Sequence, residues 1–331
     1  MPTHPHHQGP GPVPVDDLLR SPWSALDARP YLDEYLRTQW LTAEEPHERQ
    51  LTALRRLVWH CVRHVPRLAA EIVGRISESR VAHIESPAEL PVQRAGARRR
   101  SPEEFVAAAD LPIGARRETA GTHGEPQPVK IDNESCLRQV AVRMRAERWA
   151  GAPPARIVDI DGHDLLHEPC PLDDQQLEVF ASRLAIGSPA VVTAPATAYA
   201  RLCALANLRP DLVRAVIARG EDPEGAARAF AERVGAPLYS WYAAAETGVI
   251  ASPCESTRGT HVHADHLLVE IVDVDDRPVA VGTTGRIVVT DLFNQAAPYL
   301  RHELGDVGRF LEERCACGRA LPLIELWGRT N

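Results

Sequence analysis

The stretch Ser240-Trp-Tyr-Ala-Ala-Ala-Glu-Thr-Gly248 separates two sequence patterns in this chain of 331 residues. Before it, short apolar runs alternate with amphipathic stretches, whereas after it short β-branched segments follow one another between Asp and Gly turns. Strands that alternate with helices predict a doubly wound α/β sheet, and strands with no helix between them predict a small antiparallel β unit. We therefore expect an α/β protein with layered sheets and a smaller β subdomain towards its C-terminal end.

The individual elements follow from the spacing of apolar residues. Apolar residues recur at helical spacing from Leu51 to Val65, and Pro66 ends that pattern. Residues 75–112 are rich in Arg, Ser and Pro, which favours short helices and loops. We expect further helices at 136–149, 175–184, 198–207 and 226–234, and strands at 156–160, 189–193, 212–217, 267–272, 279–281 and 285–290.

Composition excludes several classes of protein. The chain has 37 Lys and Arg residues against 45 Asp and Glu residues, a net charge of −8, which argues against binding to nucleic acid or to anionic membranes. No apolar run approaches the roughly 18 residues that cross a bilayer. The seven cysteines are odd in number and scattered, unlike a secreted disulfide framework, so we expect a cytoplasmic protein.

The segment Thr119-Ala-Gly-Thr-His-Gly-Glu-Pro126 consists largely of small and hydroxylated residues. Glycines let backbone N–H groups approach a phosphate closely, and threonine hydroxyls add donors. Such a stretch on its own is also typical of a plain turn. Both interpretations stay open until the segment is placed beside the motifs that follow it.

Those motifs come in a fixed order. After the Thr119–Pro126 segment come Arg219-Gly-Glu-Asp-Pro223, the 240–248 stretch and Pro298-Tyr-Leu-Arg-His-Glu-Leu-Gly-Asp-Val-Gly-Arg-Phe310. The succession resembles the adenylate-forming superfamily, with its SSGTTGKP loop, GGEP turn, YGxTE segment and YRTGD segment. Gly259-Thr-His-Val-His-Ala-Asp-His-Leu-Leu-Val-Glu-Ile-Val272, Cys315-Ala-Cys-Gly-Arg319 and Trp327-Gly-Arg329 are similar to signatures of its phenylacetate–CoA ligase branch. The resemblance runs from about residue 45 to the end of the chain.

The resemblance implies a role for each matching residue. The loop would wrap the β- and γ-phosphates of ATP, and Glu246 would hold Mg²⁺ against the α-phosphate. The adenine would lie between Tyr242 and the 220–223 turn, and Asp306 would accept hydrogen bonds from the ribose. Glu246 and Thr122 are the expected catalytic residues. The expected nucleotide-binding residues are Thr119, Gly121, Thr122, His123, Gly124, Gly220, Glu221, Asp222, Pro223, Tyr242, Asp306 and Arg309.

A Cys/His set forms a second candidate site. Cys315 and Cys317 can face one ion from a tight knuckle, and Cys254 with His261 supplies the other pair. Three thiolates and one imidazole make a closed tetrahedral set, which is the structural type of zinc site. A C-x-C pair also arises by coincidence, and a zinc ribbon for nucleic acid is the alternative that the acidic balance disfavours. The neighbouring histidines His263 and His266 are competing ligands.

The sequence departs from the family at several points. Glu125 replaces the phosphate-loop lysine, and His302-Glu-Leu-Gly-Asp306 lacks the Arg and Thr of the YRTGD segment. The acyl-pocket region is short and poor in aromatic residues. The chain ends at Asn331, where the hinge of the family would begin, so we expect it to lack the small C-terminal lid domain.

The predicted activity is ATP-dependent conversion of a carboxylic acid into an acyl adenylate, in specialised metabolism. The acceptor is left open between CoA, a carrier protein and an amine, as are a separate lid or partner protein and a homodimer. Two alternatives remain: a degenerate homologue that binds a nucleotide or partner without turnover, and activation of a non-carboxylate substrate. The expected organisation is a tail and N-terminal segment (1–44), a nucleotide-binding α/β region (45–252) and a β subdomain with the zinc site (253–331).

Overall fold

The computed structural model describes residues 25–41, 44–119, 126–151, 157–159, 189–204, 209–222, 224–256 and 259–329. The predicted helix at 175–184 and residues 120–125 of the predicted phosphate loop lie outside these ranges. Within the described part, none of the helices combines the length and the apolar character that crossing a membrane requires.

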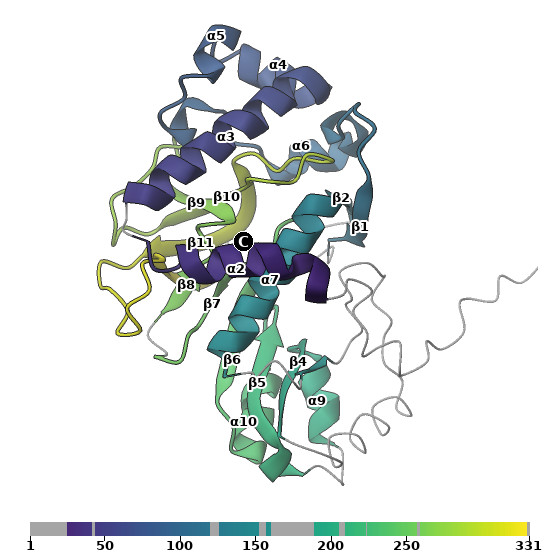
Figure 1. The fold of residues 1–331 in the computed structure, drawn as a ribbon, viewed down its shortest axis with the longest axis vertical. Coiled ribbons are helices and arrows are strands. Elements are labelled where there is room, and N and C mark those ends of the chain that lie inside the picture. Colours follow the sequence, from purple (N-terminus) through teal and green to yellow (C-terminus); the bar gives the residue numbers. More distant parts are fainter. Residues whose placement is uncertain are drawn as a thin grey trace, which may run out of the picture.

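A group of helices forms one end of the molecule (Figure 1). The predicted helix that Pro66 ends is confirmed as α3, and Pro66 then begins α4, where its missing N–H costs no hydrogen bond. The apolar faces of α3 and α4 pack with Leu268 and Leu292 of the β region in one hydrophobic cluster. The elements of this end are α3 (Glu44–His64), α4 (Pro66–Val73), α5 (Glu78–Val81), η1 (Pro87–Glu89), α6 (Ala95–Arg100) and η2 (Pro102–Phe105), whereas α2 (Ala25–Thr38) lies beside α7 nearer the centre.

The strands form a ten-stranded sheet and a separate hairpin. The order in the large sheet is β3-β4-β5-β6-β7-β8-β12-β11-β10-β9. Strands β3 to β6 run parallel, and every pairing from β6–β7 onward is antiparallel. The hairpin consists of β1 (Ile113–Glu118) and β2 (Pro128–Asp132). The predicted α/β class is therefore confirmed.

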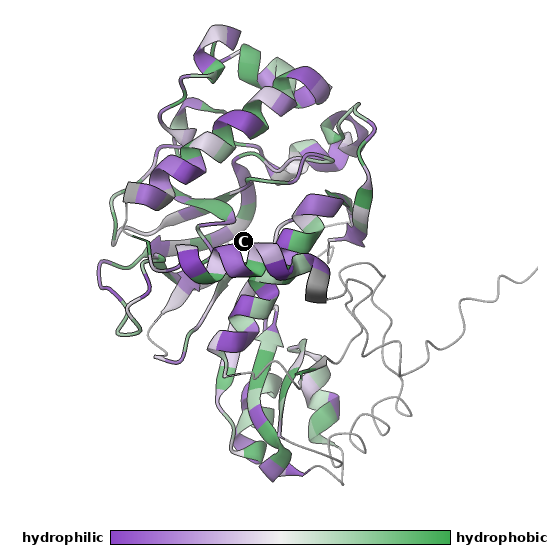
Figure 2. Cartoon of the chain, in the orientation of Figure 1, coloured by the Kyte–Doolittle hydropathy of each residue, from purple (hydrophilic) through white to green (hydrophobic). Residues whose placement is uncertain are grey.

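The parallel part is covered by helices on both faces, as a doubly wound sheet requires. One face of β4 and β5 packs on α9 and α10 and the other on α2 and α7, in two separate hydrophobic clusters. Figure 2 shows that β5 is hydrophobic along most of its length. The elements are α7 (Asn133–Trp149), β3 (Ile157–Asp159), β4 (Ala190–Pro195), α9 (Ala198–Cys203), η3 (Pro210–Leu212), β5 (Val213–Arg219), α10 (Ala226–Val234) and β6 (Leu238–Ala244).

The antiparallel part contains no helix among its described residues, as predicted. The prediction of a strand at 279–281 is wrong. The chain there leads into a turn after the β-bridge between Val272 and Pro278, and Val281 is 52% exposed. The strands are β7 (Gly248–Ser252), β8 (Thr260–Val262), β9 (Leu267–Val272), β10 (Gly285–Asp291), β11 (His302–Phe310) and β12 (Leu323–Arg329). The division at residue 252 stays a prediction, and β7 and β8 on either side of it are hydrogen-bonded.

Helix α7 lies at the centre of the molecule and carries a fully buried arginine (Figure 1). The guanidinium of Arg145 donates to both carboxylate oxygens of Asp265, at 2.5 and 2.8 Å, and to the carbonyl of Tyr35 at 3.0 Å. Asp265 lies between β8 and β9, and its carboxylate also accepts from the hydroxyl of Thr38 at 2.6 Å. Attraction to Arg145 outweighs the effect of burial and lowers the pKa of Asp265. The pair thus joins α2, α7 and the antiparallel part.

We expect Arg145→Met to destabilise the protein by about 3–5 kcal/mol, because it leaves a carboxylate buried without its counter-charge. The side chains of Arg145 and Asp265 are 0% and 6% exposed. The matched control is Arg209→Met, which breaks an ion pair whose side chains are 55% and 59% exposed and should leave the free energy of unfolding almost unchanged. Urea unfolding of both variants measures the difference, and equal losses would contradict the prediction.

Candidate functional site

The structure brings together two of the residues predicted to bind the nucleotide. Tyr242 lies on β6 and Asp306 lies on β11, strands that are not neighbours in the sheet. The phenol of Tyr242 donates to Asp306 Oδ2 at 2.7 Å. Both side chains keep partial access to solvent. An aromatic ring beside a carboxylate that accepts hydrogen bonds is a suitable arrangement for a nucleoside, with the ring against the base and the carboxylate against the sugar hydroxyls.

Glu246 lies in the tight turn that joins β6 to β7, four residues after Tyr242, and its side chain is partly exposed. The turn ends at Gly248, whose φ of +72° favours glycine. A Cβ atom at Gly248 would lie 3.1 Å from Oε1 of Gln139 on α7. The turn is therefore held closely against α7, which fixes the backbone on which Glu246 stands.

Two arginines beside this turn were not singled out from the sequence. Arg117 on β1 donates to the carbonyl of Ala245 at 3.2 Å and to Gln139 Oε1 at 3.0 Å. Arg98 on α6 is buried, with its guanidinium 4.0 Å from the ring centre of Tyr299. Both arginines interact electrostatically with Glu246. No short motif marks them, because they come from separate segments that only the folded chain brings to the turn.

The 220–223 turn follows β5 as predicted. Gly220 has a φ of +77° and open space where a Cβ would stand. Glu221 is exposed, and Pro223 lies outside the described residues. Asp222 has a local structural role, since its Oδ2 accepts from the backbone N–H of Ala227 at 3.1 Å at the start of α10.

Arg309 lies on β11 with Asp306, but its contacts lead to β12. Its Nε donates to Glu325 Oε2 at 2.9 Å, and its guanidinium lies 5.1 Å from the ring centre of Trp327. The structure therefore joins Tyr242 to Asp306 directly and gives Arg309 partners of its own. Its predicted part in nucleotide binding stays a prediction.

Of the predicted phosphate loop, only its first and last residues are described. Thr119 Oγ1 accepts from the backbone N–H of Gln127 at 2.9 Å, and the backbone N–H of Thr119 donates to the carbonyl of Gln127. These two bonds close the base of the loop between β1 and β2. Gly121, Thr122, His123 and Gly124 lie outside the described residues, as does Glu125.

The predicted Cys/His set is brought together. The ligand atoms of Cys254, His261, Cys315 and Cys317 all lie within 4.8 Å of one another. The sulfurs of Cys254 and Cys315 are 3.5 Å apart, and the sulfur of Cys317 is 3.4 Å from His261 Nε2. Ligands of a tetrahedral zinc ion, with bonds of about 2.0–2.3 Å, lie about 3.3–3.8 Å apart. These donors and distances fit a metal ion.

The surroundings of the cluster also suit a metal. His261 Nδ1 is 3.1 Å from the carbonyl of Leu321, which favours the tautomer that leaves a lone pair on Nε2 facing the thiols. Burial lowers the pKa of His261, so the imidazole is neutral at physiological pH. Burial raises the pKa of Cys254 to about 12, and a bound cation would favour the thiolate there. The competing histidines have other partners: His263 contacts Arg145 and Ser252, and His266 contacts Tyr35.

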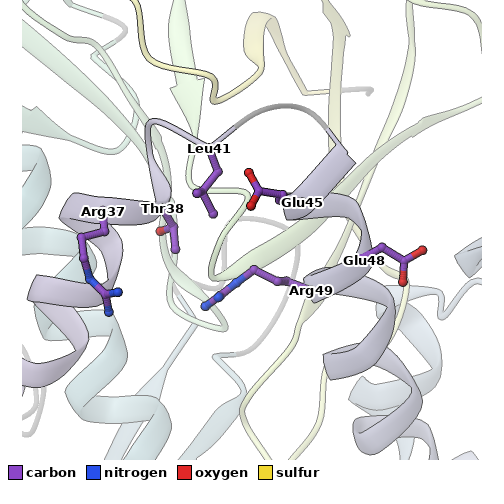
Figure 3. Close-up of a pocket in the computed structure, with 6 residues that line it drawn as sticks. All are labelled: Arg37, Thr38, Leu41, Glu45, Glu48 and Arg49. Atoms are coloured by element: carbon purple, nitrogen blue, oxygen red, sulfur yellow. The ribbon is translucent and has the colours of Figure 1, made fainter.

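A surface pocket lies elsewhere, between the end of α2 and the start of α3 (Figure 3). It has a volume of about 490 Å³, and both basic and acidic side chains surround it. The residues that line it are Arg37, Thr38, Leu41, Glu45, Glu48 and Arg49, none of which belongs to the predicted nucleotide site.

Comparison with known proteins identifies the class to which this architecture belongs. No family model matches the chain. A crystal structure of 2-hydroxyisobutyryl-CoA ligase in an open conformation, with 2-HIB-AMP and CoA, has a TM-score of 0.75 at 17% identity. The alignment covers 88% of this chain and 77% of that one. The same ligase in the postadenylation state, with R3-HIB-AMP, also has a TM-score of 0.75, at 18% identity, and covers 88% of this chain and 69% of that one. The chain has the fold of an adenylate-forming ligase.

A sequence match places the resemblance within that class. The phenylacetate-coenzyme A ligase of Thermus thermophilus is 37% identical over 86 residues. The match covers 25% of this chain, and the chain spans only 19% of the relative's length. Together with the fold, this match supports the resemblance to the phenylacetate–CoA ligase-like branch.

We expect Gly248→Ala to destabilise the protein more than Gly235→Ala does. Both glycines have positive φ, +72° and +66°, so alanine at either position costs about 1 kcal/mol of backbone strain. Nothing lies within 4 Å of a Cβ at Gly235, whereas a Cβ at Gly248 meets Gln139. The excess, about 1 kcal/mol or more, measures how tightly the turn packs on α7. Thermal unfolding of the two variants gives the comparison, and equal shifts in melting temperature would show that the turn is loosely packed.

Proposed function

We propose that this protein binds ATP and converts a carboxylic acid into its acyl adenylate, with release of pyrophosphate. The observation that carries the proposal is the contact between Tyr242 and Asp306, with Glu246 in the adjoining turn. The three residues match three positions of the resemblance and come from two segments far apart in the chain. The neighbouring ligase structures contain an acyl adenylate, one of them together with CoA, so CoA is the acceptor that we favour.

Different residues of the chain would bind different parts of ATP. Tyr242 and Asp306 would hold the nucleoside. The phosphates would be held by the loop that Thr119 closes at its base, through Gly121, Thr122, His123 and Gly124. Glu246 and the substrate phosphates would hold Mg²⁺, which offsets negative charge during the displacement. The reaction then joins a carboxylate oxygen to the α-phosphorus as the bond to pyrophosphate breaks. We expect it to take place in the cytoplasm.

We expect acid-dependent and Mg²⁺-dependent pyrophosphate release, reduced at least about 100-fold in Glu246→Gln. The matched control is Glu232→Gln, which removes an exposed carboxylate from α10 and should leave the rate unchanged. The assay uses the whole chain with a panel of carboxylic acids, both alone and with a ligase lid domain added as a separate protein. No pyrophosphate release in either arm would overturn the proposed activity.

Glu125 favours one alternative, because it puts negative charge where the related loop has a lysine. A homologue without turnover would bind ATP in calorimetry yet release no pyrophosphate in the same panel. Binding of neither ATP nor AMP would instead indicate a scaffold for a partner protein. Activation of a non-carboxylate substrate would give pyrophosphate release only with substrates that are not carboxylic acids.

We also propose that the Cys254/His261/Cys315/Cys317 cluster holds a structural zinc ion. Four protein ligands fill a tetrahedral shell and leave no position for water, so the ion would stabilise the antiparallel part and take no part in the reaction. The chain after Cys317 is joined to the end of α2: Ala320 N–H donates to the carbonyl of Gln39 at 2.9 Å, and Arg319 Nε donates to Gln39 Oε1 at 3.2 Å.

Metal analysis of the purified protein should give about one equivalent of zinc per chain. We expect Cys315→Ser to lose the ion and to lower the melting temperature. Cys203→Ser, the control, removes a cysteine outside the cluster and should keep the zinc. Less than about half an equivalent in the unmodified protein, or an unchanged melting temperature in Cys315→Ser, would contradict a structural zinc site.

A further inference from the structure

Arg117 occupies an unusual position beside the predicted site. It lies on β1 two residues before Thr119, whose hydrogen bonds with Gln127 close the base of the predicted phosphate loop. Its guanidinium contacts the carbonyl of Ala245, the residue before Glu246. Arg117 therefore stands near the end of β1 that leads into the loop, and its side chain contacts the turn that carries the predicted magnesium ligand.

The charge on Arg117 is held rigidly and partly desolvated. Its second nitrogen donates to Gln139, which is itself buried on α7. Burial lowers the pKa of Arg117 to about 10, so the group stays charged at neutral pH. The residue as a whole keeps partial exposure to solvent. A cation that is fixed, partly desolvated and still accessible binds an anion more strongly than a solvated surface cation does, because water screens it less.

The charges around Arg117 suit a magnesium-bound anion. The titratable groups that interact with it include Cys136, Asp291 and Glu246, and Arg143 adds a further positive charge. Asp291 is turned to other donors, since its Oδ1 accepts the backbone N–H groups of Phe293 and Asn294. Glu246 is the carboxylate expected to hold Mg²⁺ together with the phosphates. Arg98, which also interacts electrostatically with Glu246, adds a buried positive charge.

We propose that Arg117 is the residue that binds the polyphosphate of ATP, supplying the positive charge that Glu125 does not. The inference rests on the proposed function, because it assumes that the phosphates of the nucleotide lie beside the Glu246 turn. It assigns the phosphate-binding cation to the strand that precedes the loop. A guanidinium suits this role, since its planar group of donors can hold backbone and phosphate oxygens at once.

The experiment compares the affinities of ATP, inorganic pyrophosphate and adenosine for the whole protein by calorimetry. Arg117→Gln should weaken ATP and pyrophosphate binding by about 10- to 100-fold, the effect of losing a charge-assisted hydrogen bond. Adenosine binding should stay within about twofold, because the nucleoside makes no phosphate contact. Arg116→Gln is the matched control, since Arg116 is the exposed neighbour on the same strand and its loss should leave all three affinities unchanged.

A second variant distinguishes a loss of phosphate binding from a failure to fold. Arg117→Lys keeps the charge and should give an ATP affinity between those of the unmodified protein and Arg117→Gln, with adenosine again unaffected. This variant decides the question where Arg117→Gln does not fold. Unchanged ATP affinity in both variants, or an equal loss for adenosine, would overturn the inference and leave the proposed function intact. An unmodified protein that binds neither ATP nor adenosine would overturn both.

Discussion

The buried guanidinium of Arg145 is the interaction on which the arrangement of the molecule depends. Its side chain comes from α7, and the groups that it satisfies lie on α2 and in the loop between β8 and β9. A buried ion pair of this kind contributes little net stability relative to apolar packing. Its contribution is geometric, because the charge of Asp265 is balanced by Arg145 only when α7 and the loop between β8 and β9 lie side by side. Tyr242 and Asp306 lie on strands of the parallel and the antiparallel part and are in contact in this arrangement.

Much of the fold could be predicted from the sequence, because burial there follows simple periods. Helix α10 and strand β9 begin and end where the apolar pattern predicts: α10 has one face against a core and a glycine at each end, and β9 is a largely apolar run followed by Asp273. Helix α7 shows where the pattern fails. It buries Gln139, Arg145 and Glu147 along with its apolar residues, so its polar residues do not mark a solvent-facing side. No periodicity reveals a polar residue that is buried because a distant segment satisfies it.

The residues of the candidate site also differ in how far the sequence could predict them. The Cys/His cluster was predictable, because the ligands are rare residue types and the C-x-C spacing is local. Tyr242 and Asp306 were predictable from ordered motifs, but their direct contact was not, since it depends on how the large sheet brings β6 and β11 together. No pattern in the sequence indicated that Arg117 and Arg98 lie at the site. Arginine is common in this chain, and only the fold distinguishes an arginine held against a site from one on a solvated surface.

The positions of these two arginines bear on how a site tolerates the loss of a charged residue. A cation that binds phosphate from a loop depends on that loop's conformation, and its loss is expected to be severe if nothing else supplies charge. Arg117 on the β1–β2 hairpin is held by Gln139 of α7, and Arg98 is held on α6, so neither would lose much conformational entropy on binding an anion. The same rigidity has a cost, because Arg117 and Arg98 must remain partly desolvated when no anion is present. Their contacts with Ala245, Gln139 and the Tyr299 ring offset that cost, and the two contacts of Arg117 also join the Glu246 turn and α7 to β1.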